Sequence, residues 1–571
     1  FLASRRDTEK QARAEATIER LAQILEVSPE EIWKTVREGG GRLRFRPVLV
    51  RDDATWDEIS KIEEINLRAN GVFVRTEPVR EYKYGGVGAH FLGYIHEVNA
   101  DELKRLKEEY PDHGYRQGNL VGQQGIEAMT ESWLRGRDGY RELIVNAFGG
   151  EVDEAVLKEL GFEADNEAPV PGNNIVLTLD WDLQLAAEET LGGEHGAIAA
   201  MNPQTGEVLA LVSHPTFDPS EFARGISQKE YNALLNAPGR PLYSKVIQGQ
   251  YPPGSTWKPF VAMAGLEEGI VGSDDFAPVC HGRMRVGRRW FHCWRRGGHG
   301  KVDLLHGLRQ SCDIYFYQLG QRLGIDRIAH YARLFGFGSK TGIGLDEEKS
   351  GLVPTEEWKE RVKGEPWQAG ETLPCAIGQG FDLVTPIQLV RGISAIANGG
   401  TLVQPYFIAR AQSVDGEVIH DFSPPIPPPL PFAPEHIEAV HEGLVAVVND
   451  PQGTAHRAKV PGITVAGKTG TAQVVRLSSV EHYENDEDIP KELRDHALFV
   501  AYAPAEDPYI ALAVIIEHGG GGGRNAAPVA QKIIARYKEL REQRATAGLL
   551  PAPDAAHPEL RYAATSEEVQ P

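Results

Sequence analysis

The pattern of apolar and polar positions is helical at the start of the chain. Ile18, Leu21 and Leu25 recur on one face of the first stretch. The sequence SPEEIW then places Ser28 at an N-cap position, with Pro29 as the first helical residue and Glu31 two residues further on. This pattern predicts two helices separated by a turn.

The pattern becomes mixed from Arg42 onwards. Short apolar runs in RFRPVLVRDD, GVFVRTEPVREYKY and AHFLGYIHEV predict short strands and loops, and ADELKRLKEEY predicts a helix. The composition then turns to Asn, Pro and Gly in EADNEAPVPGNN, which is typical of a linker. We therefore place a domain boundary close to residue 170.

Beyond that boundary the pattern predicts a sheet that packs on helices. Two strands joined by a turn are expected in GAIAAMNPQTGEVLALVSHP, and two more in HALFVAYAPAEDPYIALAVIIEHGG, with long helical stretches between the pairs. The predicted fold class is α+β, with an N-terminal domain at 1–170 and a second domain at 171–543. Residues 544–571 are rich in Ala, Pro and Glu, so this tail is expected to be disordered.

Charge and length limit the possible functions. The chain has 571 residues and a formal net charge of −21, which repels phosphate backbones and argues against nucleic acid as a partner. We find no apolar run of about 18 residues, so the sequence is not expected to span a membrane by itself. Because the chain opens on Phe1 and a polar stretch, we expect the natural N-terminus to lie further upstream.

The stretch YPPGSTWKPF contains the one SxxK motif of the chain, Ser255 and Lys258. Residues three apart on a helix share a face, so the hydroxyl and the amine are expected to lie within mutual reach. A lysine that acts as a base must be neutral, which costs roughly 4–5 kcal/mol at neutral pH unless burial and nearby cations lower its pKa. The alternative is an ordinary helix cap followed by a surface lysine.

Two KTG triplets offer such a cation. Lys340 lies in the glycine-rich FGFGSKTGIGL, which predicts a loop, whereas Lys468, Thr469 and Gly470 follow the apolar GITVAG and continue into TAQVV as a strand. Between the SxxK motif and this strand, RQSCDIYFYQLG places Ser311 and Asp313 before an aromatic helical run. The Lys468 triplet is the better catalytic candidate.

The order SxxK, SxD, KTG resembles the penicilloyl-serine transferase superfamily, whose signatures are SxxK, SxN and KTG. The stretches GHGKVDLLHGLRQSCDIYFYQ, GIGQGFDLVTPIQL, VAGKTGTAQ, AHFLGYI and GIEAMTESWLRG are similar to the elongation branch of the class B penicillin-binding proteins. The resemblance covers nearly the whole chain and implies an antiparallel sheet flanked by helices, preceded by an elongated α+β pedestal domain. Asp313 departs from the usual Asn, although an SxD form is also found in this branch.

The resemblance also implies a role for each motif residue. Ser255 would attack the D-Ala-D-Ala carbonyl of a peptidoglycan stem peptide, and Lys258 would take its proton. Ser311 would relay protons, with Asp313 as the third residue of that motif, and β-lactams would acylate Ser255. Substrate binding would involve Lys468, Thr469, Gly470 and Thr471, and the backbone N–H groups of Ser255 and Thr471 would form an oxyanion hole.

Partners and location follow from the same resemblance. It implies an inner-membrane anchor upstream of this sequence, domains on the periplasmic side, lipid-linked precursor strands as substrates, and a SEDS-family glycosyltransferase of the RodA type with other elongation-complex proteins as partners. A division-specific transpeptidase and a non-catalytic activator of the glycosyltransferase stay open as alternatives. A secreted β-lactamase fits less well, because it has no use for some 170 additional N-terminal residues.

Three of the four cysteines lie in one segment with a histidine. Cys280, Cys293, His299 and Cys312 form a tetrahedral zinc set by residue type, although the short CxxC pair is absent. The resemblance implies the same four positions as ligands of one structural zinc, which the chemistry does not require. A Cys280–Cys293 disulfide, buried free thiols, and substitution by His281, His292 or His306 stay open.

Overall fold

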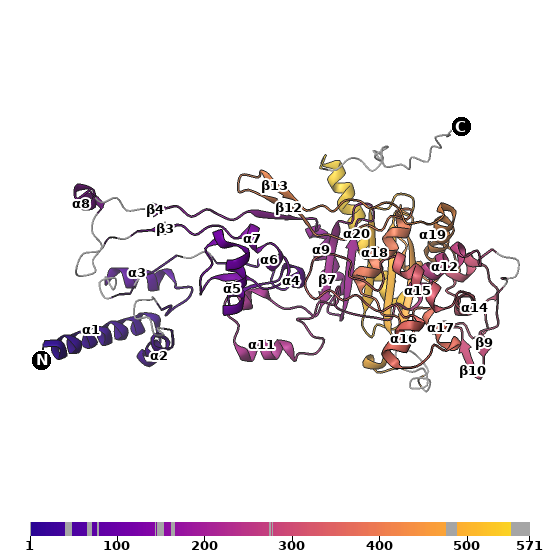
Figure 1. Cartoon of the computed structure of the whole chain (residues 1–571), viewed down its shortest axis with the longest axis horizontal. Helices are drawn as coiled ribbons and strands as arrows, with labels where there is room; N and C mark the ends of the chain where they lie inside the picture. Colours follow the sequence, from indigo (N-terminus) through magenta and orange to yellow (C-terminus); the bar gives the residue numbers. More distant parts are fainter. Residues whose placement is uncertain are drawn as a thin grey trace. The chain divides into compact units, whose positions relative to one another are not determined.

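The computed structural model describes residues 2–39, 48–65, 71, 72, 74–76, 79–142, 144, 154–161, 166–272, 276, 278–475, 483 and 488–549. The chain forms two compact units, Phe1–Glu81 and Tyr82–Pro571 (Figure 1). Most of the tail that was predicted to be disordered lies outside the described residues, and the boundary near residue 170 stays a prediction.

The first unit contains the helices α1 (Leu2–Leu25), α2 (Pro29–Gly39) and α3 (Trp56–Glu64). The predicted pair of helices is confirmed. Ser28 and Glu31 form the expected reciprocal cap, with each side chain accepting from the other residue's backbone N–H at 3.2 and 3.1 Å. The small core of the unit is built from Leu21, Leu25, Ile32 and Ile62.

The second unit opens with short elements around small cores. Of the strands expected between residues 42 and 98, only β1 forms within the described part of that region, and Ala89–Leu92 is a helical turn instead. β1 pairs with β2 and β3 pairs with β4, all antiparallel. The elements are α4 (Ala89–Leu92), β1 (Ile95–Glu97), α5 (Ala100–Glu109), β2 (Leu120–Gly122), α6 (Gly125–Met129), α7 (Glu131–Leu134), β3 (Tyr140–Arg141), α8 (Glu154–Glu159) and β4 (Asn166–Glu167).

A five-stranded antiparallel sheet organises the rest of this unit, in the order β14-β15-β16-β6-β7. Both predicted strand pairs and the strand through the second KTG triplet are confirmed. The strands are β6 (Gly196–Met201), β7 (Val208–His214), β14 (Ala466–Ala472), β15 (His496–Ala503) and β16 (Ile510–Ile516). Because β14 stands first in this order, one of its edges is free of the sheet.

Helices cover both faces of the sheet (Figure 1). Along β16, Leu512 and Val514 pack into a core with α9 and α20, whereas Ala513 and Ile515 pack into a second core with α12 and α18. This alternation follows from the two-residue period of a strand that is buried on both faces. The α+β fold predicted from the sequence is therefore confirmed.

The remaining elements surround this sheet and a second, three-stranded sheet of order β13-β12-β5. Its strands are β5 (Asn174–Leu177), β12 (Ile408–Gln412) and β13 (Val418–Asp421). The remaining helices of the unit are α9 (Trp181–Leu191), α10 (Pro219–Ala223), α11 (Gln228–Leu235), α12 (Lys258–Glu267), α13 (Leu304–Arg309), α14 (Asp313–Leu323), α15 (Ile325–Leu334), α16 (Glu356–Lys363), α17 (Ala369–Cys375), α18 (Pro386–Ala397), α19 (Pro434–Asn449) and α20 (Gly522–Thr546).

Two short strand pairs lie between α12 and α13. They are the hairpin β9 (Arg283–Val286) with β10 (Arg289–His292), and the pair β8 (Val279–Cys280) with β11 (Gly300–Lys301). Among the helices that the structure describes, none combines the length and the apolar character needed to cross a membrane.

Candidate active site

Ser255 lies in a single 3-10 turn, η3 (Gly254–Trp257), that leads directly into α12. This turn makes Lys258 the first residue of α12, three residues after Ser255. Gly254 has φ +54°, and a Cβ there would lie 2.6 Å from the carbonyl oxygen of Thr471. A glycine is therefore required for the serine turn to approach strand β14.

Lys258 is fully buried, and its amine makes three hydrogen bonds. Nζ donates to the carbonyl oxygen of Ser311 at 2.9 Å, to its hydroxyl at 3.2 Å and to Oδ1 of Asp313 at 2.7 Å. The side chain of Lys258 is 0% exposed and that of Asp313 12%. The alternative of a surface lysine is therefore excluded, and Lys258 forms a buried ion pair that the sequence did not predict.

Ser311 ends helix α13 in a left-handed conformation, with φ +53°. Its N–H donates to the carbonyl oxygen of Leu308 at 3.1 Å, and the N–H of Cys312 donates to the carbonyl oxygen of Gly307 at 2.9 Å. These two bonds form the Schellman motif, in which the left-handed position usually carries glycine. The chain thus accepts backbone strain to place a serine hydroxyl at this point.

Lys468 lies on β14 and reaches the same serine. Its Nζ donates to Oγ of Ser311 at 2.9 Å and to the carbonyl oxygen of Thr469 at 3.1 Å. Burial, together with the positive charge of Lys258, holds the pKa of Lys468 well below its usual value, and the carboxylate of Asp313 partly opposes this shift.

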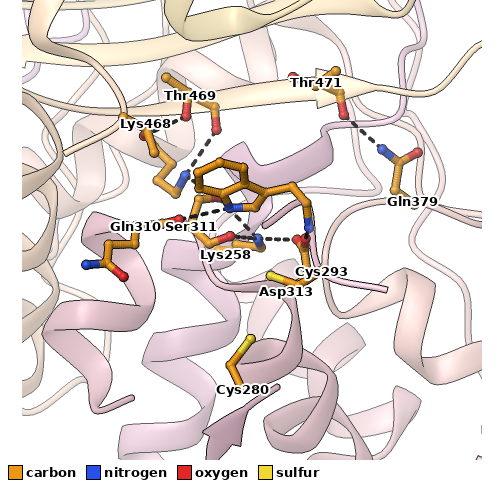
Figure 2. A network of polar contacts seen from close by, with 12 residues as sticks. Lys258, Cys280, Cys293, Gln310, Ser311, Asp313, Gln379, Lys468, Thr469 and Thr471 are labelled. Atoms are coloured by element: carbon orange, nitrogen blue, oxygen red, sulfur yellow. Dashed lines mark hydrogen bonds and ion pairs between the residues drawn. The ribbon is translucent and has the colours of Figure 1, made fainter. Parts of the chain in front are cut away.

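The two amines therefore meet at one hydroxyl, which Figure 2 shows between strand β14 and the segment that carries Ser311. Lys258 contacts the carboxylate of Asp313, whereas Lys468 contacts only the Ser311 hydroxyl and the Thr469 carbonyl among the described residues, and the lowered pKa of Lys468 favours the loss of one proton from the cluster. A lysine amine of lowered pKa in contact with a serine hydroxyl is suited to proton transfer through that hydroxyl.

Thr469, Gly470 and Thr471 follow Lys468 on β14. The hydroxyl of Thr469 lies 2.9 Å from that of Thr454. Thr471 is exposed, and its carbonyl accepts from the Gln379 side chain at 2.9 Å (Figure 2). A Cβ at Gly470 would lie 2.8 Å from the methyl group of Thr256, so the strand packs here directly against the serine turn.

The first KTG triplet lies in a loop, as predicted. Lys340 is exposed, and no residue of the stretch from Phe335 to Leu345 belongs to a strand. Thr341 uses its N–H and its hydroxyl to bind Glu348, both at 2.6 Å. The first KTG triplet therefore has a structural role, because Thr341 and Glu348 hold its loop together.

The cysteine cluster lies directly behind the catalytic loop. Cys280, Cys293, His299 and Cys312 bring their ligand atoms within 4.8 Å of one another, and all four cysteines of the chain are free thiols. Nδ1 of His299 lies 3.5 Å from Sγ of Cys280 and 3.6 Å from Sγ of Cys293. A tetrahedral zinc with ordinary Zn–S and Zn–N bonds would set such ligand pairs about 3.6 Å apart. The donor set and its spacing fit zinc.

Hydrogen bonding and burial shift the pKa values of the three thiols in the cluster. A hydrogen bond between the two side chains lowers the pKa of Cys293 and raises that of Cys312, and burial raises the pKa of Cys280. Cys375 lies outside the cluster as a small buried residue.

Trp294 was not identified from the sequence. Its backbone N–H donates to Oδ2 of Asp313 at 3.0 Å, and its indole N–H donates to the carbonyl oxygen of Gln310 at 3.0 Å. Both contacts bridge the cysteine segment and the Ser311 loop. The one available signal was the position of Trp294 directly after Cys293.

Comparison with known proteins identifies the family. The model described as penicillin binding protein transpeptidase domain matches residues 196–535, and that described as penicillin-binding protein dimerisation domain matches residues 1–177. The chain belongs to the class B penicillin-binding proteins. It is 36% identical over 530 residues to the peptidoglycan D,D-transpeptidase MrdA of Salmonella typhimurium, covering 92% of this chain and 83% of the relative.

Solved structures agree with this family. The class B chain is similar to penicillin-binding protein 2 of Pseudomonas aeruginosa in complex with WCK 5153, at 36% identity and a TM-score of 0.67, covering 81% of this chain and 91% of that one. It is also similar to penicillin-binding protein 2 of Helicobacter pylori in complex with MreC, at 29% identity and a TM-score of 0.79, covering 92% and 91% of the two chains.

Proposed function

We propose that this class B penicillin-binding protein is a peptidoglycan D,D-transpeptidase that cross-links stem peptides during cell elongation through an acyl-enzyme on Ser255. The observation that carries the proposal is the meeting of Lys258 and Lys468 at the Ser311 hydroxyl, beside the serine turn and the free edge of β14. The chain's similarity to proteins named peptidoglycan D,D-transpeptidase supports the same activity.

Acylation begins with Ser255. Its Oγ attacks the carbonyl carbon of the first D-alanine in D-Ala-D-Ala, and Lys258 in its neutral form takes the hydroxyl proton. The C–N bond to the terminal D-alanine then breaks, and the leaving nitrogen receives a proton through Ser311. The short contacts from Ser311 to both lysines support this relay, because a hydroxyl can accept from one amine and donate to the other.

The free edge of β14 supplies the binding site. Lys468 and the hydroxyls of Thr469 and Thr471 hold the terminal carboxylate, and the backbone N–H groups of Ser255 and Thr471 stabilise the oxyanion. In deacylation an acceptor amine takes the position that the leaving D-alanine held. The acceptor amine attacks the acyl carbonyl, its C–N bond forms as the ester bond to Ser255 breaks, and the proton returns to the serine oxygen.

We further propose that Cys280, Cys293, His299 and Cys312 hold one structural zinc ion. Bound there, the ion would brace the loop that carries Ser311 and Asp313, because Cys312 stands between them in the sequence. The residues of the chain carry out every step of acyl transfer.

The proposed substrate also suggests location and partners. Peptidoglycan lies outside the cytoplasmic membrane, so we place both domains on the periplasmic side, with the pedestal of residues 1–170 nearest an N-terminal membrane anchor. A SEDS-family glycosyltransferase of the RodA type would supply the glycan strands. A similarity of 30% identity and TM-score 0.67 to a chain of a complex that coordinates polymerisation and crosslinking supports such a partner.

Mass spectrometry of the reaction products tests the function. The protein is incubated with a pentapeptide stem ending in D-Ala-D-Ala and with an acceptor amine. We expect D-alanine release and a new amide product from the wild type and neither from Ser255→Ala. Turnover by Ser255→Ala equal to wild type would contradict the proposal.

A further inference from the structure

A groove of about 620 Å³ opens beside the candidate active site. It begins near the serine turn, because Pro252 and Gln379 line it and Gln379 binds the carbonyl of Thr471. One wall comes from the hairpin β9–β10 and another from the residues that follow β14. Those wall residues are Val286, Arg289 and Phe291, and Gln473, Val474 and Val475.

The direction of a bound peptide follows from the site, so this inference rests on the proposed function. The terminal carboxylate is held near Lys468 and Thr469, and the reacting carbonyl lies at Ser255. The part of the donor peptide that precedes D-Ala-D-Ala must then leave along β14 past Thr471 and enter the groove at Gln473. The volume suits a ligand of a few residues.

Two charged residues line the groove, Arg289 and Glu371, and the charge of Arg289 is the one that a ligand could pair with. Glu371 also lines the groove, but its carboxylate already accepts from Lys359 at 2.7 and 2.8 Å and from the backbone of Gln368 at 2.7 Å. The guanidinium of Arg289 lies 5.1 Å from the centre of the Phe291 ring, and no carboxylate of the described residues pairs with it. A cation that is positioned by an aromatic ring and lacks an anion is suited to an anionic ligand.

The hairpin register separates Arg289 from the other arginines of this segment. Arg289 pairs with Val286 and shares a face with Phe291, whereas Arg285 pairs with Trp290 on the opposite face. Both Arg283 and Arg285 lie over the ring of Trp290, at 4.6 and 6.0 Å. Arg285 is thus a matched control, because it belongs to the same hairpin and does not line the groove.

We propose that the groove binds the donor stem peptide upstream of D-Ala-D-Ala, and that Arg289 determines specificity by pairing with a side-chain carboxylate of the residue directly before that pair. The planar guanidinium can bind both carboxylate oxygens at once, which an amide in the same place cannot match. The site therefore selects donor peptides with a free carboxylate over their amidated forms.

Protection against penicillin provides a test that needs no turnover. Two synthetic pentapeptides are compared that differ only in a carboxylate or a primary amide on the third residue. The rate of Ser255 acylation by a fluorescent penicillin is measured with each peptide and divided by the rate without peptide, for the wild type, Arg289→Gln and Arg285→Gln.

We expect the carboxylate peptide to protect the wild type at about tenfold lower concentration than the amide peptide. This ratio should fall to about one in Arg289→Gln and stay unchanged in Arg285→Gln. Equal protection by both peptides in the wild type, no protection by either, or the same ratio in Arg289→Gln and the wild type would overturn the inference. Absence of acylation by penicillin would instead overturn the proposed function.

Discussion

The carboxylate of Asp313 accepts a hydrogen bond of 2.7 Å from the buried amine of Lys258. The same carboxylate accepts from the Trp294 backbone on its other oxygen, so its position is fixed from two sides. Asp313 therefore balances one positive charge in a cluster that contains two lysines. The protonation of that cluster should control the pH dependence of acylation.

The substitution Asp313→Asn is predicted to shift the acid limb of the pH profile to lower pH. Acylation needs Lys258 in its neutral form, and the cluster provides it by losing one proton, because the Ser311 hydroxyl can pass a proton between Lys258 and Lys468. The charge of Asp313 raises the pKa of Lys468 against the lowering effects of burial and Lys258. Removing that charge lowers this pKa further. Penicillin acylation rates measured as a function of pH check the shift, and an unchanged limb or one at higher pH would contradict it.

Substitutions of the two KTG lysines are predicted to have very different effects on the rate of acylation. Lys468→Met removes a buried amine that binds Ser311, and acylation should slow by about a hundredfold or more. Lys340→Met changes an exposed loop residue and should leave the rate within about twofold of the wild type. Single-turnover acylation kinetics of the two variants test this prediction. Equal effects would show that the choice between the triplets is mistaken.

The left-handed backbone conformation of Ser311 is predicted to lower the free energy of unfolding. Glycine adopts its left-handed conformation without strain, so Ser311→Gly should be more stable than Ser311→Ala by about 1 kcal/mol. Both variants lack the hydroxyl and should acylate slowly. Denaturant unfolding measures the difference in the free energy of unfolding. A Gly variant no more stable than the Ala variant would argue against strain at this residue.

The cysteine cluster is predicted to bind about one zinc ion per chain. Elemental analysis of the purified protein should find it in the wild type and in Cys375→Ser, whose thiol lies outside the cluster, and should find none in Cys312→Ser. If the wild type contains no metal, the four residues are buried thiols and a histidine only.

Local sequence signals predicted local structure well. The cap formed by Ser28 and Glu31 depends on residues three apart, and the strand through Lys468 was distinguished from the loop at Lys340 by its apolar flanks. The stretch AHFLGYIHEV was expected to form short strands and loops; it contains strand β1, but its first residues, Ala89–Leu92, are helical. Four residues do not distinguish a period of 2 from one of 3.6, and here the run forms a helical turn after Gly88.

The contacts that organise the site could not be predicted in the same way. Motif order indicated which residues belong together, but the ion pair of Lys258 with Asp313 joins segments 55 residues apart and depends on how α12 and α14 pack. The strained backbone of Ser311 and the role of Trp294 likewise depend on tertiary structure, since neither has a distinct local pattern. The groove at Arg289 could not be predicted either, because it depends on the register of the β9–β10 hairpin, which places Arg289 and Phe291 on the same face.

The most direct test of the central claim is intact-protein mass spectrometry after incubation with benzylpenicillin, followed by peptide mapping. The account predicts one covalent adduct whose mass equals the whole antibiotic, because the serine adds across the β-lactam ring, located on the peptide that contains Ser255. It predicts no adduct on Ser255→Ala. An unmodified wild type, or an adduct that persists in Ser255→Ala, would contradict the assignment of Ser255 as the nucleophile.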